Sequence, residues 1–375
     1  MSNIQLVPVN EPLLDGNEAK YLLECIRTGW ISSEGPYVSE FERMFAARVG
    51  RKHAVAVANG SVALDAAVVA AGIGPGDEVI MPAFTIISCA AAVVRAGALP
   101  VLVDSDPVTW NMDVAAIEGK ITTRTRAIMV VHIYGLPVDM DPLIAVAEKH
   151  GLKIIEDAAE MHGQTYKGRP CGSFGLISTF SFYPNKHVTT GEGGMIVTDD
   201  EVVAEHCRSL RNLCFRPEKR FVHDELGWNY RMTNLQAAIG LAQLERLDEF
   251  VARKREMGRR YTEALAPLRD RLQLPLERTD FADNIYWVYG MVLDDAMPFD
   301  ATEMMRRLAM RKIGSRPFFW SMHEQPVFVK MGMFGGERYP VAERLARRGF
   351  YVPSGMALSA EQIAYVATTL PEVLL

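Results

Sequence analysis

The 375-residue sequence has few cysteines and no long apolar run. Five cysteines, an odd number, lie at irregular spacings without any C-x-x-C pair, and this predicts neither a disulfide framework nor a zinc site. The beginning, MSNIQLVPVNEP, lacks the basic-then-apolar pattern of a signal peptide, and no apolar stretch reaches the 18 residues of a membrane span. We therefore expect a cytoplasmic protein without a membrane partner.

Positive charge is not in excess either. The formal net charge is −6, whereas binding to a nucleic-acid backbone requires clustered lysine and arginine. We therefore expect no nucleic-acid partner. The basic runs Arg253-Lys254-Arg255 and Arg259-Arg260 lie in a helical pattern and favour a solvated helix face over a binding patch.

The first half of the chain alternates short β-rich runs with helical windows. An amphipathic helix is expected over residues 15–28, stopped by Gly29. The spacing predicts buried, mostly parallel strands in an α/β fold, and the last two runs are joined by a loop too short for a helix, which indicates a mixed sheet. The expected strands are Ala54–Ala58, Glu78–Pro82, Pro100–Asp104, Ala127–His132, Lys153–Asp157, Ser178–Ser181 and Met195–Thr198, with helices such as Ser61–Ala71 and Pro142–His150 between them.

The pattern of expected helices and strands changes after residue 234. One long helix is expected from about Asn234 to Leu265, followed by a strand near Tyr286–Leu293 and a helix near Ala301–Arg311. A strand near Gly349–Pro353 and a terminal helix complete a smaller α+β unit. At 375 residues two domains are expected. We place a large domain at 1–250 and a small one at 251–375.

Asn59-Gly60-Ser61 stands where a predicted strand ends and a helix begins. The start of a helix offers unpaired backbone N–H groups and a partial positive charge, which suit a phosphate. Asn-Gly-Ser is also a good helix cap, and taken alone the capping role is favoured.

An acidic cluster, Glu156-Asp157-Ala158-Ala159-Glu160, follows the apolar run Ile154-Ile155. Ligands of open α/β sheets bind at the carboxyl ends of strands, so a carboxylate here is well placed to contact one. Such a carboxylate could pair with a pyridinium nitrogen and keep it protonated. The alternative is that Asp157 only caps a helix.

Ser181 is followed five residues later by Lys186, and then by the glycine-rich stretch Thr190-Gly191-Glu192-Gly193-Gly194. A lysine in a partly buried loop can lose its proton and form an imine, although most lysines are solvated surface charges. The glycines would allow close backbone approach to a bound ring. This stretch is no P-loop, because a strand rather than a helix follows it.

Together, a phosphate-type helix start, an acid at a strand end and a loop lysine are the parts that a pyridoxal 5′-phosphate (PLP) site requires. The chain resembles the DegT/DnrJ/EryC1/StrS sugar aminotransferases, which have the aspartate-aminotransferase (fold type I) architecture. The resemblance rests on residues 30–33, 72–82, 131–135, 156–160, 181–186, 190–194, 227–236 and 315–319.

The resemblance implies roles for individual residues. Lys186 would carry PLP through a Schiff base, Asp157 would face the ring nitrogen, and Glu160 would lie near the ring hydroxyl. Gly60, Ser61 and Ser181 would hold the phosphate. Asn229 would reach the phosphate in the neighbouring subunit, which implies a homodimer with shared active sites. Weaker candidates for substrate contacts are Trp30, Ser33, His187, Arg316 and Phe319.

One position departs from the family pattern. Residue 86 is usually aromatic in the family and stacks on the cofactor ring, but here it is Ile86. An aliphatic side chain can pack on the ring with less specificity. Phe84 would compensate if its side chain points the same way, which a regularly alternating strand would allow.

The implied reaction moves an amino group from glutamate to a keto sugar carried by a nucleotide, with ping-pong kinetics through a pyridoxamine phosphate form. Residues 230–245 and the pattern Arg316-Pro-x-Phe…Met322-His323 are most similar to members that convert GDP-4-keto-6-deoxymannose to GDP-perosamine. UDP- and dTDP-linked 3- or 4-keto sugars remain alternatives. So does a related sugar dehydratase, although those enzymes carry histidine where Lys186 stands. A non-catalytic regulator would be expected to lose the lysine, acid or phosphate residues, and none is lost.

Overall fold

The structure, a computed structural model, describes residues 6–216 and 218–375. Seven strands form the main sheet, in the order β1-β9-β8-β5-β4-β2-β3. Their bounds are β1 His53–Val57, β2 Glu78–Pro82, β3 Leu99–Val103, β4 Thr125–Val131, β5 Lys153–Asp157, β8 Ile177–Ser181 and β9 Gly194–Thr198. Only β9 runs antiparallel to its neighbours, which confirms the predicted α/β fold with a mixed sheet.

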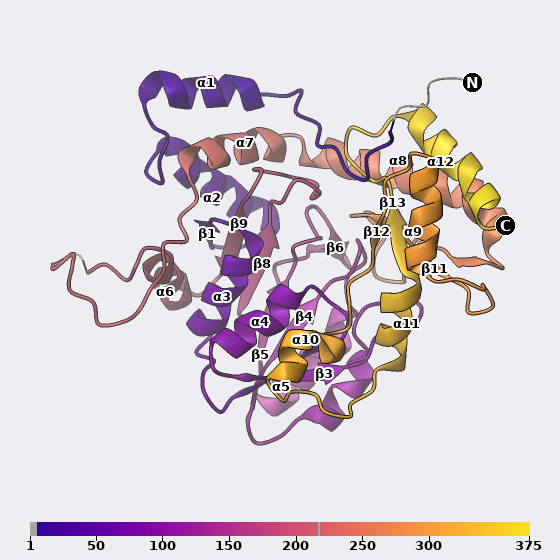
Figure 1. The fold of residues 1–375 in the computed structure, drawn as a ribbon. Helices are drawn as coiled ribbons and strands as arrows, with labels where there is room; N and C mark the ends of the chain where they lie inside the picture. The colour runs from indigo at the N-terminus through magenta and orange to yellow at the C-terminus, as the bar shows by residue number, and fades with distance from the viewer. Residues whose placement is uncertain (1–5, 217) are drawn as a thin grey trace.

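Alternating side chains of each strand enter two separate cores, because successive residues of a strand point to opposite faces. Val55, Val57 and Ile196 belong to the core that contains residues of α3, α4 and α6, whereas Ala54 and Ala56 belong to the core that contains residues of α2, α5 and α7. The result is a sheet between two layers of helices (Figure 1). The helix bounds are α2 Pro36–Val49, α3 Gly60–Ala70, α4 Ile87–Arg95, α5 Met140–His150, α6 Glu201–Arg211 and α7 Asn234–Leu244.

The direction of the strands brings three chain segments to one edge. Strand β5 is parallel to β8, and β1 and β8 are both antiparallel to β9 that lies between them. The carboxyl ends of β1, β5 and β8 therefore lie at the same edge of the sheet. Asn59, Asp157 and Ser181 meet there although they are far apart in the sequence.

A second, smaller sheet of four antiparallel strands has the order β10-β11-β13-β12. Its core is completed by α8, α9, α12 and Val7. The bounds are β10 Leu272–Gln273, β11 Tyr289–Leu293, β12 Arg316–Pro317, β13 Gly349–Val352, α8 Leu247–Leu265, α9 Ala301–Met310 and α12 Ala360–Val373. The first turn of α8 packs in a core of the main sheet and its later turns in that of the smaller one. The division near residue 250 stays a prediction.

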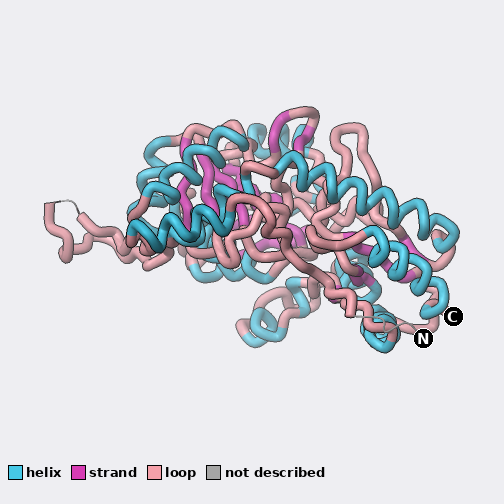
Figure 2. The backbone as a smooth tube through the Cα atoms, turned by 90° about the horizontal axis from the view of Figure 1, so that it is seen from above, coloured by secondary structure: helices cyan, strands magenta, loops and turns pink. Residues whose placement is uncertain are grey.

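The remaining elements lie around these two sheets. Figure 2 shows that the loop between α6 and α7 projects from the body of the molecule. In the described part of the chain, no helix is both long and apolar enough to cross a membrane. The other bounds are α1 Glu18–Thr28, α10 Pro326–Lys330, α11 Pro340–Arg348, and the hairpin strands β6 Thr165–Tyr166 and β7 Arg169–Pro170.

The prediction of a single long helix over residues 234–265 is wrong, because this segment forms two helices, α7 and α8. Arg246 leaves the helical conformation, with φ −111° and ψ 12°. Its guanidinium pairs with Asp15 and Glu249. The acidic first turn of α8, Asp248 and Glu249, is the sequence signal for a new helix start.

The prediction that Arg253-Lys254-Arg255 forms a solvated face is wrong at its centre. Lys254 is 2% exposed. Its ammonium donates to the carbonyl of Trp287 at 2.7 Å and also to that of Ser354. The predicted strand near Tyr286 begins only at Tyr289, since Tyr286 has a φ of +48° that a strand does not allow.

Candidate active site

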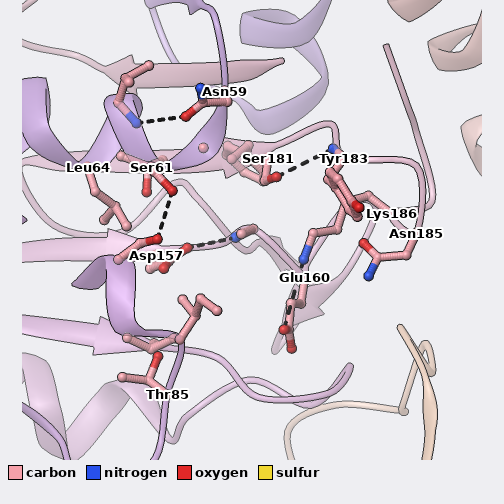
Figure 3. A pocket seen from close by; sticks show the side chains of 18 of the residues that line it. Asn59, Ser61, Leu64, Thr85, Asp157, Glu160, Ser181, Tyr183, Asn185 and Lys186 are labelled. Carbon is pink, nitrogen blue, oxygen red and sulfur yellow. Dashed lines mark hydrogen bonds and ion pairs between the residues drawn. The ribbon is translucent and has the colours of Figure 1, made fainter. Parts of the chain in front are cut away.

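A cavity of about 780 Å³ opens at the edge where β1, β5 and β8 end. Its walls carry the three signals found in the sequence: the start of α3, the acid that ends β5, and the loop lysine (Figure 3). Most of its charge is buried, so electrostatic interactions inside it are stronger than in water.

Lys186 projects its ammonium into this cavity. Its backbone N–H donates to the carbonyl of Tyr183, which closes a turn after β8. Lys186 Nζ lies 4.0 Å from Glu160 Oε1 and 4.0 Å from the centre of the Trp287 ring. Burial lowers the pKa of Lys186, and the carboxylates of Glu160 and Asp157 partly offset this. A lysine with a lowered pKa is a better nucleophile and base at neutral pH.

Asp157 ends β5 and is almost completely buried, with 3% exposure. Its Oδ1 accepts the backbone N–H of Ala159 at 3.1 Å, and its Oδ2 accepts the thiol of Cys89 at 3.1 Å. Burial raises the pKa of Asp157, while these hydrogen bonds and Lys186 lower it. No helix follows Asp157, so the helix-cap alternative is wrong and the carboxylate is free to serve a ligand.

Glu160 lies beside Lys186 in the same cavity. Its Oε2 accepts the backbone N–H of Tyr134 at 2.6 Å. Burial raises the pKa of Glu160 to about 8, with Lys186 acting in the opposite direction. The carboxyl group can therefore donate or accept a hydrogen bond near neutral pH.

The start of α3 combines a cap with a space for an anion. The side chain of Asn59 accepts the N–H of Val62, which confirms its capping role. A side chain on Gly60 would lie 2.7 Å from Ser181 Cβ, so only glycine brings the helix start this close to β8. Ser61 and Ser181 face the cavity beside it, and Ser61 Oγ lies 2.7 Å from Ser88 Oγ. Hydroxyls and backbone N–H groups at a helix start suit a phosphate.

The prediction that the glycine-rich stretch 190–194 allows close backbone approach to a bound ring is wrong. Gly191, Gly193 and Gly194 do not line the cavity. A side chain on Gly194 would lie 2.4 Å from the carbonyl oxygen of Asn59. The glycine thus lets β9 support the turn that starts α3, rather than making room for a ring.

The polar groups that line the cavity match the chemical groups of PLP. Thr179 Oγ1 and Asn185 Oδ1 are buried there, without a hydrogen-bond partner among the described residues. Buried polar atoms normally have partners, so a ligand that supplies them is expected. An anion site, an acid, an amine and two unpaired oxygens together match a phosphate, a ring nitrogen and an aldehyde.

Not all predicted residues lie in this cavity. Ile86 and Phe319 line it, and Ile86 is 40% exposed. Phe84 does not compensate for Ile86, because it is fully buried against Tyr134, Phe318 and Phe319. His187 is also buried outside the cavity, where its Nε2 donates to the carbonyl of Ile285. Trp30, Ser33, Arg316 and Asn229 lie outside it too, and all but the half-buried Ser33 are exposed.

Several cavity residues were not anticipated from the sequence. Trp287 contacts Lys186 from one side, and its Nε1 donates to the carbonyl of Asn185, which fixes the lysine loop. Tyr230 and Tyr351 complete the wall. Trp287 and Tyr351 come from the chain around the smaller sheet, and neither is in a motif. The only available signal was their aromatic type.

A fold of this kind, with a lysine, an acid and an anion site at one sheet edge, is typical of PLP-dependent enzymes of fold type I. Residues 12–371 match the DegT/DnrJ/EryC1/StrS aminotransferase family, so the chain belongs to that family. The chain is thus an aminotransferase that uses PLP, an amino donor and a nucleotide-linked sugar.

Several relatives align with this chain over nearly its whole length. A GDP-perosamine synthase of Caulobacter vibrioides is 45% identical over 374 residues, covering 100% of both chains. The solved structure of DesV from S. venezuelae, in complex with a ketimine intermediate, is 33% identical with a TM-score of 0.91 and covers 99% of both chains. Spr1654 from Streptococcus pneumoniae, solved in a PLP-form, is 26% identical with a TM-score of 0.89, covering 99% of this chain and 98% of that one.

Proposed function

We propose that this enzyme transfers the amino group of glutamate to GDP-4-keto-6-deoxymannose and releases GDP-perosamine. The observation that carries the proposal is Lys186, whose side chain is 10% exposed and lines one cavity with Asp157 and the start of α3. The choice of sugar and nucleotide is supported by the full-length similarity to a GDP-perosamine synthase.

The residues that would hold PLP are those at the sheet edge. Gly60, Ser61 and Ser181 would hold the phosphate, Asp157 the ring nitrogen and Glu160 the ring hydroxyl. When bound, the cofactor supplies an electron sink for the carbon that loses a proton. The Asp157 carboxylate would favour a protonated ring nitrogen, because a buried anion stabilises an adjacent cation.

Lys186 performs the proton transfers. Because burial lowers its pKa, more of its amine is neutral than for an exposed lysine, and the neutral amine can take the donor's α-proton. The resulting ammonium would deliver that proton to the cofactor carbon that receives the amino group, so that Lys186 would serve as base and then as acid. Trp287 and Glu160, each 4.0 Å from Nζ, restrict where the amine can lie.

The test is amino transfer from glutamate to a panel of 3-keto and 4-keto sugars on GDP, UDP and dTDP. We expect turnover of the GDP-linked 4-keto sugar with parallel lines in a double-reciprocal plot, as ping-pong kinetics require. Lys186→Ala should lower the rate by at least about 10³-fold, while Lys167→Ala, at an exposed lysine paired with Asp141, should not. Turnover of UDP- or dTDP-linked sugars alone would remove the perosamine assignment. Loss of water without amino transfer would indicate the dehydratase.

We further propose that two copies of the chain form a dimer with shared sites in the cytoplasm. Asn229 is exposed, lies outside its own chain's cavity, and follows the loop that projects from the body (Figure 1). Its placement suits a contact with the partner's phosphate. The five buried, free cysteines agree with a reducing compartment.

A further inference from the structure

A short chain of hydrogen bonds joins Thr85, Cys89 and Asp157. Cys89 Sγ lies 3.1 Å from Asp157 Oδ2, and Thr85 Oγ1 lies 3.4 Å from Cys89 Sγ. Thr85 and Cys89 are both 0% exposed and Asp157 is 3% exposed. Thr85 ends the loop that follows β2, and Cys89 lies in the first turn of α4, so their positions are fixed by the backbone.

The directions of these bonds follow from charge. Burial and the neighbouring Asp157 carboxylate raise the pKa of the Cys89 thiol well above its usual range, so the sulfur keeps its proton. A thiol that keeps its proton beside a carboxylate donates to it. The Thr85 hydroxyl then donates to the sulfur, and the three groups form a chain that ends on Asp157 Oδ2.

The other oxygen of Asp157 is held by the backbone N–H of Ala159. Each carboxylate oxygen thus has one donor, and each can accept a further one. A thiol is a weak donor, so it orients the carboxylate while leaving most of its basicity for a third partner. In the cavity that partner would be the ring nitrogen of PLP.

We propose that Cys89 is a positioning residue of this enzyme, which, with Thr85 hydrogen-bonded to it, keeps Asp157 ionised and turned toward the cavity. The inference rests on the proposed function only in assigning Asp157 to the ring nitrogen. It does not depend on which sugar or nucleotide is the substrate.

Cys207 provides a matched comparison. It is also 0% exposed and lies in α6, on the same face of the sheet as Cys89. Its pKa is raised chiefly by burial, and its thiol has no hydrogen bond to a carboxylate. A substitution there removes the same buried volume without touching Asp157.

The experiment measures the dissociation constant of PLP from the apoenzyme by absorbance titration, without any sugar. We expect Cys89→Ala to weaken PLP binding about 5- to 20-fold, as loss of a hydrogen bond to a charged group does. Cys89→Ser should restore binding to within about twofold of the wild type. Cys207→Ala should change it by less than about twofold, and thermal unfolding of each apoenzyme reports on its fold.

A double-mutant cycle separates a role through Asp157 from a packing role. In an Asp157→Asn background, Cys89→Ala should have almost no further effect on PLP binding. An equal loss in both backgrounds, or a loss no larger than that of Cys207→Ala, would overturn the proposal. Normal PLP binding by Asp157→Asn alone would instead contradict the role of Asp157 in the proposed function, so the two failures are distinguishable.

Discussion

Individual side chains set the charge of the cavity before any ligand is bound. Glu160 and Asp157 are both buried, and burial raises the pKa of each. Among the described residues that line the cavity, Lys186 is the one lysine, and its pKa is lowered. The neighbouring His162 is neutral, because burial lowers its pKa to about 3. The cavity therefore gains stability when one carboxyl group holds a proton, and burial raises the pKa of Glu160 to about 8.

This balance predicts how stability depends on pH. The pKa of Glu160 rises from 4.5 to about 8 in the folded chain. The folded chain therefore binds more protons than the unfolded one between these values, and stability is lost as the pH rises from 4.5 through 8. In the apoenzyme, Glu160→Gln should reduce the loss of unfolding free energy between pH 5 and pH 8.5 by up to about 4 kcal/mol.

Urea unfolding at the two pH values measures this difference. Glu205→Gln is the control, because Glu205 is exposed on α6 and pairs with Arg208. If Glu160→Gln and the wild type lose the same free energy over this pH range, Glu160 does not carry the proton.

At the scale of elements, the contact between β9 and the start of α3 supports the anion site. A side chain on Gly194 would lie 2.4 Å from the carbonyl oxygen of Asn59. We expect Gly194→Ala to destabilise the protein by about 1–3 kcal/mol, as overpacking does, and to weaken PLP binding because the Asn59–Gly60 turn must move. Denaturant unfolding and PLP titration measure the two effects.

Gly74 offers the control for that substitution. It has open space around it and no positive φ, so Gly74→Ala should leave both quantities nearly unchanged. Tight PLP binding by a destabilised Gly194→Ala protein would show that the turn is not part of the anion site.

The elements that the sequence predicts well are those whose pattern is local. Strands β2 and β5 begin and end where the apolar runs do, and Gly29 ends α1 in the left-handed conformation with a φ of +76°. The order of motifs also identified Lys186, Asp157 and the start of α3, because each follows a strand at the same edge.

Other features could not be predicted because they depend on distant partners. The break at Arg246 requires Asp15, which is 231 residues away. The buried position of Lys254 requires the carbonyls of Trp287 and Ser354. Phe84 points into a cluster of aromatic rings instead of the cavity, and those rings come from two other parts of the chain. Local periodicity carries no information about such contacts.

At the scale of the whole molecule, a shared site predicts complementation between two inactive chains. Lys186→Ala would lack the amine, and Asn229→Ala would lack the contact with the partner's phosphate. A mixed dimer of the two variants has one site with both residues intact. We expect mixing under conditions that exchange subunits to restore a substantial part of the activity of one site.

Two controls accompany that measurement. Each variant mixed with itself should stay inactive, and chains that have not exchanged should show no recovery. Absence of recovery after proven exchange would mean that each chain completes its own site.

The central claim is that Lys186 is the amine that carries PLP. The most direct measurement is borohydride reduction of the holoenzyme, followed by proteolysis and mass spectrometry of the peptides. We predict that the pyridoxyl group is found on Lys186 alone, at about one per chain. A pyridoxyl group on another lysine, such as the buried Lys254, or an unmodified Lys186 in an enzyme that still transfers amino groups, would contradict the account.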